Sequence, residues 1–141
     1  MSAIVECPQC RRRNRVPSAA TGRPRCAQCR NWLPWIVEAG DGDFAAAVDN
    51  APLPVLVDLW APWCGPCRTL SPALEHLAAE RAGSLKLVKV NVDDAPRTAQ
   101  RFGVQAVPTL LIARSGQVVD RRSGALPLAA LRTWVDQTLA P

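Results

Sequence analysis

The chain has 141 residues, of which 48% are hydrophobic and 21% are charged, which indicates a globular protein and excludes two full-sized domains. No apolar run approaches the roughly 18 residues of a membrane span, and no basic-then-apolar signal sequence opens the chain, so we expect a cytoplasmic protein without membrane contact. The net charge of +5 is local, because seven arginines and one glutamate give residues 1–30 a charge of +6, while ten basic and eleven acidic residues leave −1 on residues 31–141.

Four cysteines of this basic segment form two Cys-x-x-Cys pairs that fifteen residues separate. Each such turn directs two thiolates at one ion, and two turns complete the tetrahedron of a structural zinc site. The segment also needs a metal, since its few large apolar side chains cannot build a core. We therefore predict a zinc-ribbon-like module over residues 1–33 that holds Zn²⁺, with two disulfides or two redox-active pairs as the alternative. The predicted ligands are Cys7, Cys10, Cys26 and Cys29.

The rest of the chain, residues 34–141, alternates apolar runs with amphipathic segments, which predicts one α/β domain. Strands are expected at residues 35–38, 53–60, 85–92, 109–113 and 117–120. Helices are expected at residues 44–48, 64–83, 95–102 and 128–139. Asp43 is expected to cap the first helix, and Pro72 to bend or break the second. This order of elements predicts a central mixed sheet flanked by helices.

A third pair, Cys64 and Cys67, follows a buried strand and opens a helix. The unpaired N–H groups at a helix N-terminus favour an anion, so Cys64 is expected to be partly thiolate and the more accessible of the two sulfurs. Cys67 lies on the same helical face, within reach of a disulfide with Cys64. Pro66 suits the first helical turn, where its missing N–H is tolerated.

Asp58 is a lone carboxylate within the apolar strand that leads to Cys64. Burial raises the pKa of a carboxyl, which suits a proton acceptor for Cys67. The alternative is an aspartate exposed at the end of the strand. Lys89 stands in the neighbouring strand, where the sequence alone indicates a solvated side chain.

Three stretches resemble the signatures of the thioredoxin family in order and spacing: residues 57–67 (VDLWAPWCGPC), 88–93 (VKVNVD) and 107–110 (VPTL). With its N-terminal cysteines, the chain is similar to members that carry a four-cysteine zinc extension. The resemblance implies the thioredoxin fold and a cytosolic protein-disulfide reductase that works by dithiol-disulfide exchange. It also implies disulfide-containing proteins as substrates and re-reduction by an NADPH-dependent thioredoxin reductase, with no NADPH or flavin bound to this chain itself.

The resemblance implies a role for each residue around the third pair. Cys64 would be the nucleophile and Cys67 the resolving thiol of a redox-active disulfide, and Asp58 would transfer protons. Lys89 matches the family lysine near that aspartate. The remaining residues would tune the redox potential or contact substrate: Gly65 and Pro66 between the cysteines, Trp63 as an exposed platform, and a cis Val107-Pro108 bond facing the disulfide.

Two other function classes compete with a reductase. An oxidase or isomerase on the same fold is disfavoured, because Gly65-Pro66 resembles the reductants and because no export signal is present. A binding module would use the arginines of residues 11–15 to contact nucleic acid or an acidic protein, but such a run is more often simply solvated. We expect a monomer that does not bind nucleic acid.

Overall fold

The computed structural model describes residues 2–20 and 22–140. The strands are β1 (Ser2–Glu6), β2 (Arg13–Pro17), β3 (Trp35–Glu38), β4 (Val55–Trp60), β5 (Lys86–Asn91), β6 (Thr109–Arg114) and β7 (Gln117–Ser123). The helices are the π-helix η1 (Ala45–Asp49) and the α-helices α1 (Gly65–Glu80), α2 (Pro96–Arg101) and α3 (Leu128–Leu139). None of the helices described is long and apolar enough to cross a membrane.

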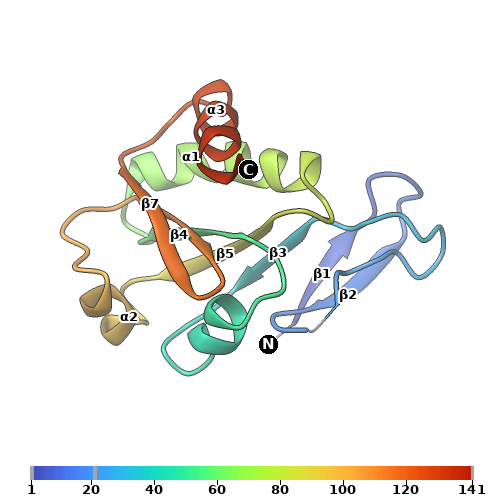
Figure 1. Cartoon of the computed structure of the whole chain (residues 1–141), viewed down its shortest axis with the longest axis horizontal. Helices are drawn as coiled ribbons and strands as arrows, with labels where there is room; N and C mark the ends of the chain where they lie inside the picture. The colour runs from blue at the N-terminus through green and yellow to red at the C-terminus, as the bar shows by residue number, and fades with distance from the viewer. Residues whose placement is uncertain (1, 21, 141) are drawn as a thin grey trace.

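A five-stranded mixed sheet of order β3-β5-β4-β6-β7 forms the centre of the molecule (Figure 1). β3 and β4 run parallel to β5, whereas β6 runs antiparallel to β4 and to β7. Helices α1 and α3 lie together over one face of this sheet. The predicted central mixed sheet flanked by helices is confirmed.

The strand β4 sorts its side chains strictly between the two faces of the sheet. Val55, Val57 and Leu59 join a buried cluster with Phe44, Val48 and Ala95. Leu56 instead packs with apolar residues of α1 and α3. Because side chains alternate along a strand, Asp58 shares the face of Leu56 and lies under α1. Because both faces of this strand make apolar contacts, every residue of the strand except Asp58 is hydrophobic.

Three local details differ from the prediction. Helix α1 continues through Pro72, so the predicted break is wrong, while a bend at this residue stays a prediction; a proline in the interior of a helix removes one hydrogen bond, but the packed apolar face of the helix remains. The Asp43 carboxylate caps no helix and instead accepts the N–H of Gly40 at 2.7 Å, which closes the preceding turn. The segment 45–49 forms a π-helix rather than an α-helix.

The N-terminal segment contains a hairpin, β1 paired antiparallel with β2, that the sequence did not predict. In β2 the exposed Arg13 and Arg15 alternate with the buried Asn14 and Val16, so the pattern has a period of two but little apolar content. Val16 packs into the same buried cluster as Trp35 of β3. The segment therefore shares a core with the main sheet as well as carrying its cysteine cluster.

Candidate functional site

Cys64 and Cys67 are joined as a disulfide at the start of α1, with 5.3 Å between their Cα atoms. Cys64 is the N-cap residue of the helix, and its Sγ atom accepts the N–H of Cys67 at 3.2 Å. That N–H is one of the donors that a helix leaves unpaired at its N-terminus. A thiolate on Cys64 would thus be stabilised by a backbone hydrogen bond and by the helix dipole.

Exposure does not separate the two sulfurs in this disulfide form. Cys64 is 4% exposed and Cys67 is 3% exposed, so the predicted greater accessibility of Cys64 is not seen. The physical reason is that the disulfide and the neighbouring chain at Val107 cover both residues: the Cys64 Sγ atom lies 3.6 Å from the Val107 carbonyl oxygen. Position on the helix, rather than exposure, distinguishes Cys64.

The side chains that surround the disulfide are arranged as follows. Trp63 is 70% exposed, and its indole N–H donates to Asp93 at 3.1 Å, which holds the ring beside Cys64. The Val107-Pro108 peptide bond is cis, as the resemblance implied. Gly65 and Pro66 are exposed in the first turn of α1. The residues expected at a substrate surface thus lie around one disulfide.

Asp58 is buried at 2% exposure, and its Oδ1 atom has no hydrogen-bond partner among the described residues. Burial raises the pKa of this carboxyl to about 6, although the positive charge of Lys89 acts in the opposite direction. The interpretation as an exposed strand-end aspartate is therefore wrong. A cavity of about 200 Å³ is lined by both Asp58 and Cys67, together with Trp60 and Lys89. The carboxyl of Asp58 and the side chain of Cys67 thus border the same space.

Lys89 is the register partner of Asp58 on the adjacent strand β5. Its ammonium nevertheless donates to the Ser71 hydroxyl at 2.6 Å and lies 3.6 Å from a carboxylate oxygen of Glu75. Only 15% of the lysine side chain is exposed, so the expectation of a solvated lysine is wrong. Sequence reasoning missed Ser71 and Glu75, although their spacing of four and eight residues from Cys67 places all three on one helical face.

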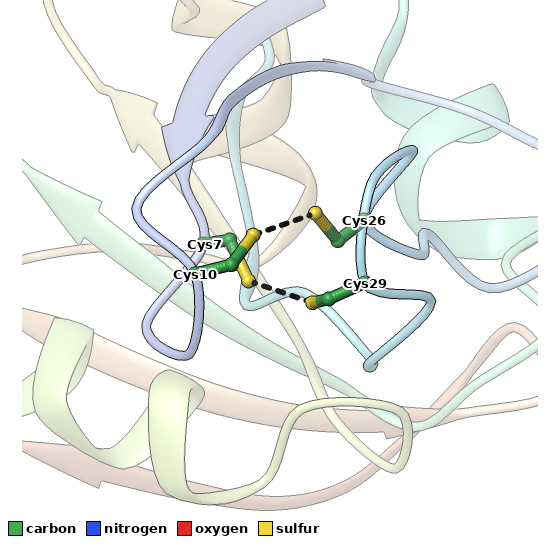
Figure 2. Close-up of side chains that lie close together, drawn as sticks. All are labelled: Cys7, Cys10, Cys26 and Cys29. Carbon is green, nitrogen blue, oxygen red and sulfur yellow. Dashed lines mark hydrogen bonds between the residues drawn. The ribbon is translucent and has the colours of Figure 1, made fainter.

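The four N-terminal cysteines form a second cluster, in which all four sulfur atoms lie within 4.8 Å of one another. Figure 2 shows the sulfurs converging from two separate turns, with 3.6 Å between those of Cys7 and Cys29 and 3.4 Å between those of Cys10 and Cys26. A tetrahedral zinc ion with Zn–S bonds of about 2.3 Å separates its sulfurs by about 3.8 Å. The donor set and its spacing therefore fit such an ion.

The two cysteine turns repeat one backbone pattern. The Cys7 carbonyl accepts the N–H of Arg11 at 2.9 Å, and the Cys26 carbonyl accepts that of Arg30 at 3.0 Å. Arg11 and Arg30 both adopt a positive φ, 70° and 68°, which turns the chain back after each pair. The side-chain amide of Asn31 also donates to the Cys29 sulfur. Such donors stabilise thiolates, the form that binds metal.

Comparison with known proteins agrees with the redox geometry. The family model described as Thioredoxin matches residues 35–137. The chain belongs to the thioredoxin family. A thioredoxin from Haemophilus influenzae is 47% identical over 102 residues, which cover 72% of this chain and 95% of that protein. A thioredoxin from Porphyra purpurea is 43% identical over 105 residues (74% and 98%), and a chloroplastic M-type thioredoxin from Zea mays is 39% identical over 123 residues (86% and 74%).

Membership of the thioredoxin family explains the chemistry of the Cys64–Cys67 pair. The chain has the thioredoxin fold and is a thiol-disulfide oxidoreductase whose redox pair is Cys64 and Cys67. Of the predicted neighbours, Asp58, Lys89, Trp63 and Val107 all lie around this pair. His76 is on the surface, where its side chain is 60% exposed and lies 3.1 Å from Glu80. The four N-terminal cysteines form a separate site, whose first residue, Cys7, precedes Cys64 by 57 positions.

Proposed function

We propose that this thioredoxin is a cytosolic protein-disulfide reductase that an NADPH-dependent thioredoxin reductase re-reduces. The observation that carries the proposal is the Cys64–Cys67 disulfide at the N-terminus of α1, beside a buried carboxyl. Gly65 and Pro66 between the cysteines favour a reductant over an oxidase. No NADPH or flavin site on this chain is needed, because the reductase supplies the electrons.

The proposed reaction has two exchange steps. The Cys64 thiolate attacks one sulfur of a substrate disulfide, which forms a mixed disulfide and releases the other substrate sulfur as a thiolate. Asp58 then accepts the proton of the Cys67 thiol through the shared cavity. The Cys67 thiolate attacks Cys64 Sγ, frees the second substrate thiolate and forms the Cys64–Cys67 disulfide. Two electrons from NADPH, delivered by the reductase, restore both thiols.

The residues around the disulfide have supporting roles in this proposal. Trp63, Val107 and Pro108 form the surface on which a substrate chain rests, since they adjoin Cys64 from two sides. Gly65 and Pro66 tune the redox potential. Lys89 acts on the reaction through the charge it places near Asp58.

We further propose that residues 1–33 are a structural zinc module and residues 34–141 the catalytic domain. The family match begins at residue 35, which supports this boundary. The convergence of four sulfurs from two backbone-matched turns supports Zn²⁺ as the ion. Four protein ligands leave no open position, so the ion would stabilise the module and take no part in the exchange.

A coupled assay tests the proposed reaction. Reduced protein, its cognate reductase and NADPH are mixed with a protein disulfide such as insulin, and NADPH oxidation is followed with time. We expect turnover that depends on both proteins and that vanishes in Cys64→Ser. The control Cys10→Ser alters the other cluster and is expected to keep the active-site thiols competent. Absence of turnover with a reductase that is active on its own thioredoxin would refute the proposal.

A further inference from the structure

One face of α1 carries a polar stripe that runs away from the redox pair. Cys67, Ser71 and Glu75 are spaced four residues apart, so they stack along one side of the helix. The stripe lies against Asp58 on β4 and Lys89 on β5, because Cys67 and Ser71 share a cavity with both. Ser71 and Glu75 lie outside the Cys-x-x-Cys motif and have no role in the exchange steps above.

The ammonium of Lys89 is bound to the stripe and not to the aspartate beside it. Its Nζ atom lies 2.6 Å from the Ser71 Oγ atom and 3.6 Å from the Glu75 Oε1 atom. Among the ion pairs of the described residues, none joins Lys89 to Asp58. The Asp58 Oδ1 atom stays buried without a hydrogen bond. The four-carbon stem of a lysine allows other positions, so these two partners select one of them.

Few other charged groups face Asp58. Glu38 of β3 and Arg68 of α1 line the same cavity, and the Arg68 guanidinium is already bonded to the Pro62 carbonyl at 2.7 Å. On the other side, the partner of Asp58 in β6 is the uncharged Leu110. Of the two cations that line this cavity, Lys89 is thus the one whose charge acts on the pKa of Asp58.

We propose that Ser71 and Glu75 are positioning residues for the exchange reaction: they hold the Lys89 ammonium on α1, away from the Asp58 carboxylate, so that Asp58 remains a proton acceptor. An ammonium within about 4 Å of a carboxylate typically lowers the pKa of that carboxyl by 1 to 3. Such a carboxylate would bind the Cys67 proton less well. This inference rests on the proposed role of Asp58, which its test examines separately.

The test measures the pKa of Asp58 from the carbon-13 shift of its side-chain carboxyl in the oxidised protein, where neither active-site thiol titrates. Ser71→Ala, which changes no charge, is expected to lower this pKa by about 1, and Ser71→Ala with Glu75→Gln to lower it further. In a Lys89→Met background, Ser71→Ala should have no effect, because the cation to be released is gone. Thr69→Ala, on the exposed side of the same helix, is the matched control and should leave the pKa unchanged.

The outcomes separate the inference from the proposed function. An Asp58 pKa that stays constant or rises in Ser71→Ala, or that falls equally without Lys89, overturns the positioning role. The acid limb of the exchange rate should shift to lower pH together with the measured pKa. If the pKa falls as expected but Asp58→Asn exchanges at the wild-type rate at every pH, the positioning geometry stands and the proton-transfer role of Asp58 fails.

Discussion

The Nζ atom of Lys86, in the main sheet, lies 2.5 Å from the backbone carbonyl oxygen of Ser18, which precedes it by 68 positions. The same ammonium donates to the Ala47 carbonyl at 2.6 Å and lies 4.1 Å from the centre of the Trp35 ring. Trp35 in turn donates its indole N–H to the Pro17 carbonyl at 2.8 Å. Through these contacts the fully buried Lys86 and Trp35 hold the N-terminal segment against the thioredoxin sheet.

Lys86→Met is expected to weaken this attachment. The variant leaves two backbone carbonyls without their donor, and each such buried group costs about 1 to 3 kcal/mol. We expect the free energy of unfolding at pH 7 to fall by about 2 kcal/mol, measured by urea denaturation of the whole chain.

The pH dependence of the free energy of unfolding provides a control for the Lys86→Met prediction. Burial lowers the pKa of Lys86 to about 8, whereas an unfolded lysine titrates near 10.4. Between these values the unfolded chain binds more protons, so the wild type gains stability as the pH rises from about 8 to about 10. Lys86→Met lacks this gain, and the difference between the two proteins should widen with pH. A difference that narrows over this range would contradict the assignment.

Gly83→Ala is expected to disturb a second contact of the N-terminal segment, with the turn that follows α1. A Cβ atom at Gly83 would lie 2.7 Å from the Trp32 ring, and the residue has a positive φ of 85°. Gly103 has a positive φ of 57° but open space around it, so Gly103→Ala measures the backbone cost alone. We expect Gly103→Ala to cost about 1 kcal/mol and Gly83→Ala about 1 to 3 kcal/mol more. Equal losses in thermal denaturation would show that Trp32 does not pack there.

Asp58→Asn is expected to slow dithiol-disulfide exchange about tenfold or more at pH 7, because the proton acceptor for Cys67 is lost while the shape is kept. The slowing should shrink as the pH rises and Cys67 ionises without help. Stopped-flow tryptophan fluorescence follows the exchange. Equal slowing at every pH would indicate a packing role instead.

The same variant is expected to be more stable than the wild type at neutral pH. The folded pKa of Asp58, about 6, lies above the unfolded value near 3.9, so stability falls as the pH rises between them. Above pH 6 the buried charge costs about 3 kcal/mol, part of which Asn removes. The advantage should vanish below pH 4, and urea titrations at several pH values measure it.

Variants of the two redox cysteines should differ in what they trap. Cys67→Ser retains the attacking sulfur but not the resolving one, so mixed disulfides with a substrate protein should accumulate and dissolve in a small thiol. Cys64→Ser should trap little, because Cys67 lies further from the helix N-terminus. Non-reducing gels decide the assignment, and equal trapping by both variants would overturn it.

The purified reduced protein is expected to contain one zinc ion per chain, bound by the N-terminal cysteines. Metal analysis measures the ion, and thiol titration should find Cys64 and Cys67 reactive while the other four are protected. Cys10→Ser should lose most of the zinc, whereas Cys64→Ser should retain it. A zinc-free protein with all six thiols reactive under native conditions would refute the metal site.

The sequence by itself determined the redox pair, the cysteine cluster and the order of elements after residue 34. These depend on local signals: the Cys-x-x-Cys turns, the apolar run around Asp58, and the helical spacing after Cys64. The sequence did not predict the hairpin β1-β2, because one of its inward-facing residues is Asn14. The side-chain amide of Asn14 donates hydrogen bonds to a backbone carbonyl and to a cysteine sulfur, and so adds no apolar residue to the pattern.

Only the tertiary structure decided what the lysines do. Lys86 and Lys89 stand three residues apart in one strand, and neither can be told from a solvated lysine by its neighbours in sequence. Lys86 points to the face where Ser18 and Ala47 present carbonyls, whereas Lys89 points to the face where α1 presents Ser71 and Glu75. Their partners come from elements far away in the chain, and burial among those partners, rather than residue type, determines the role of each amine.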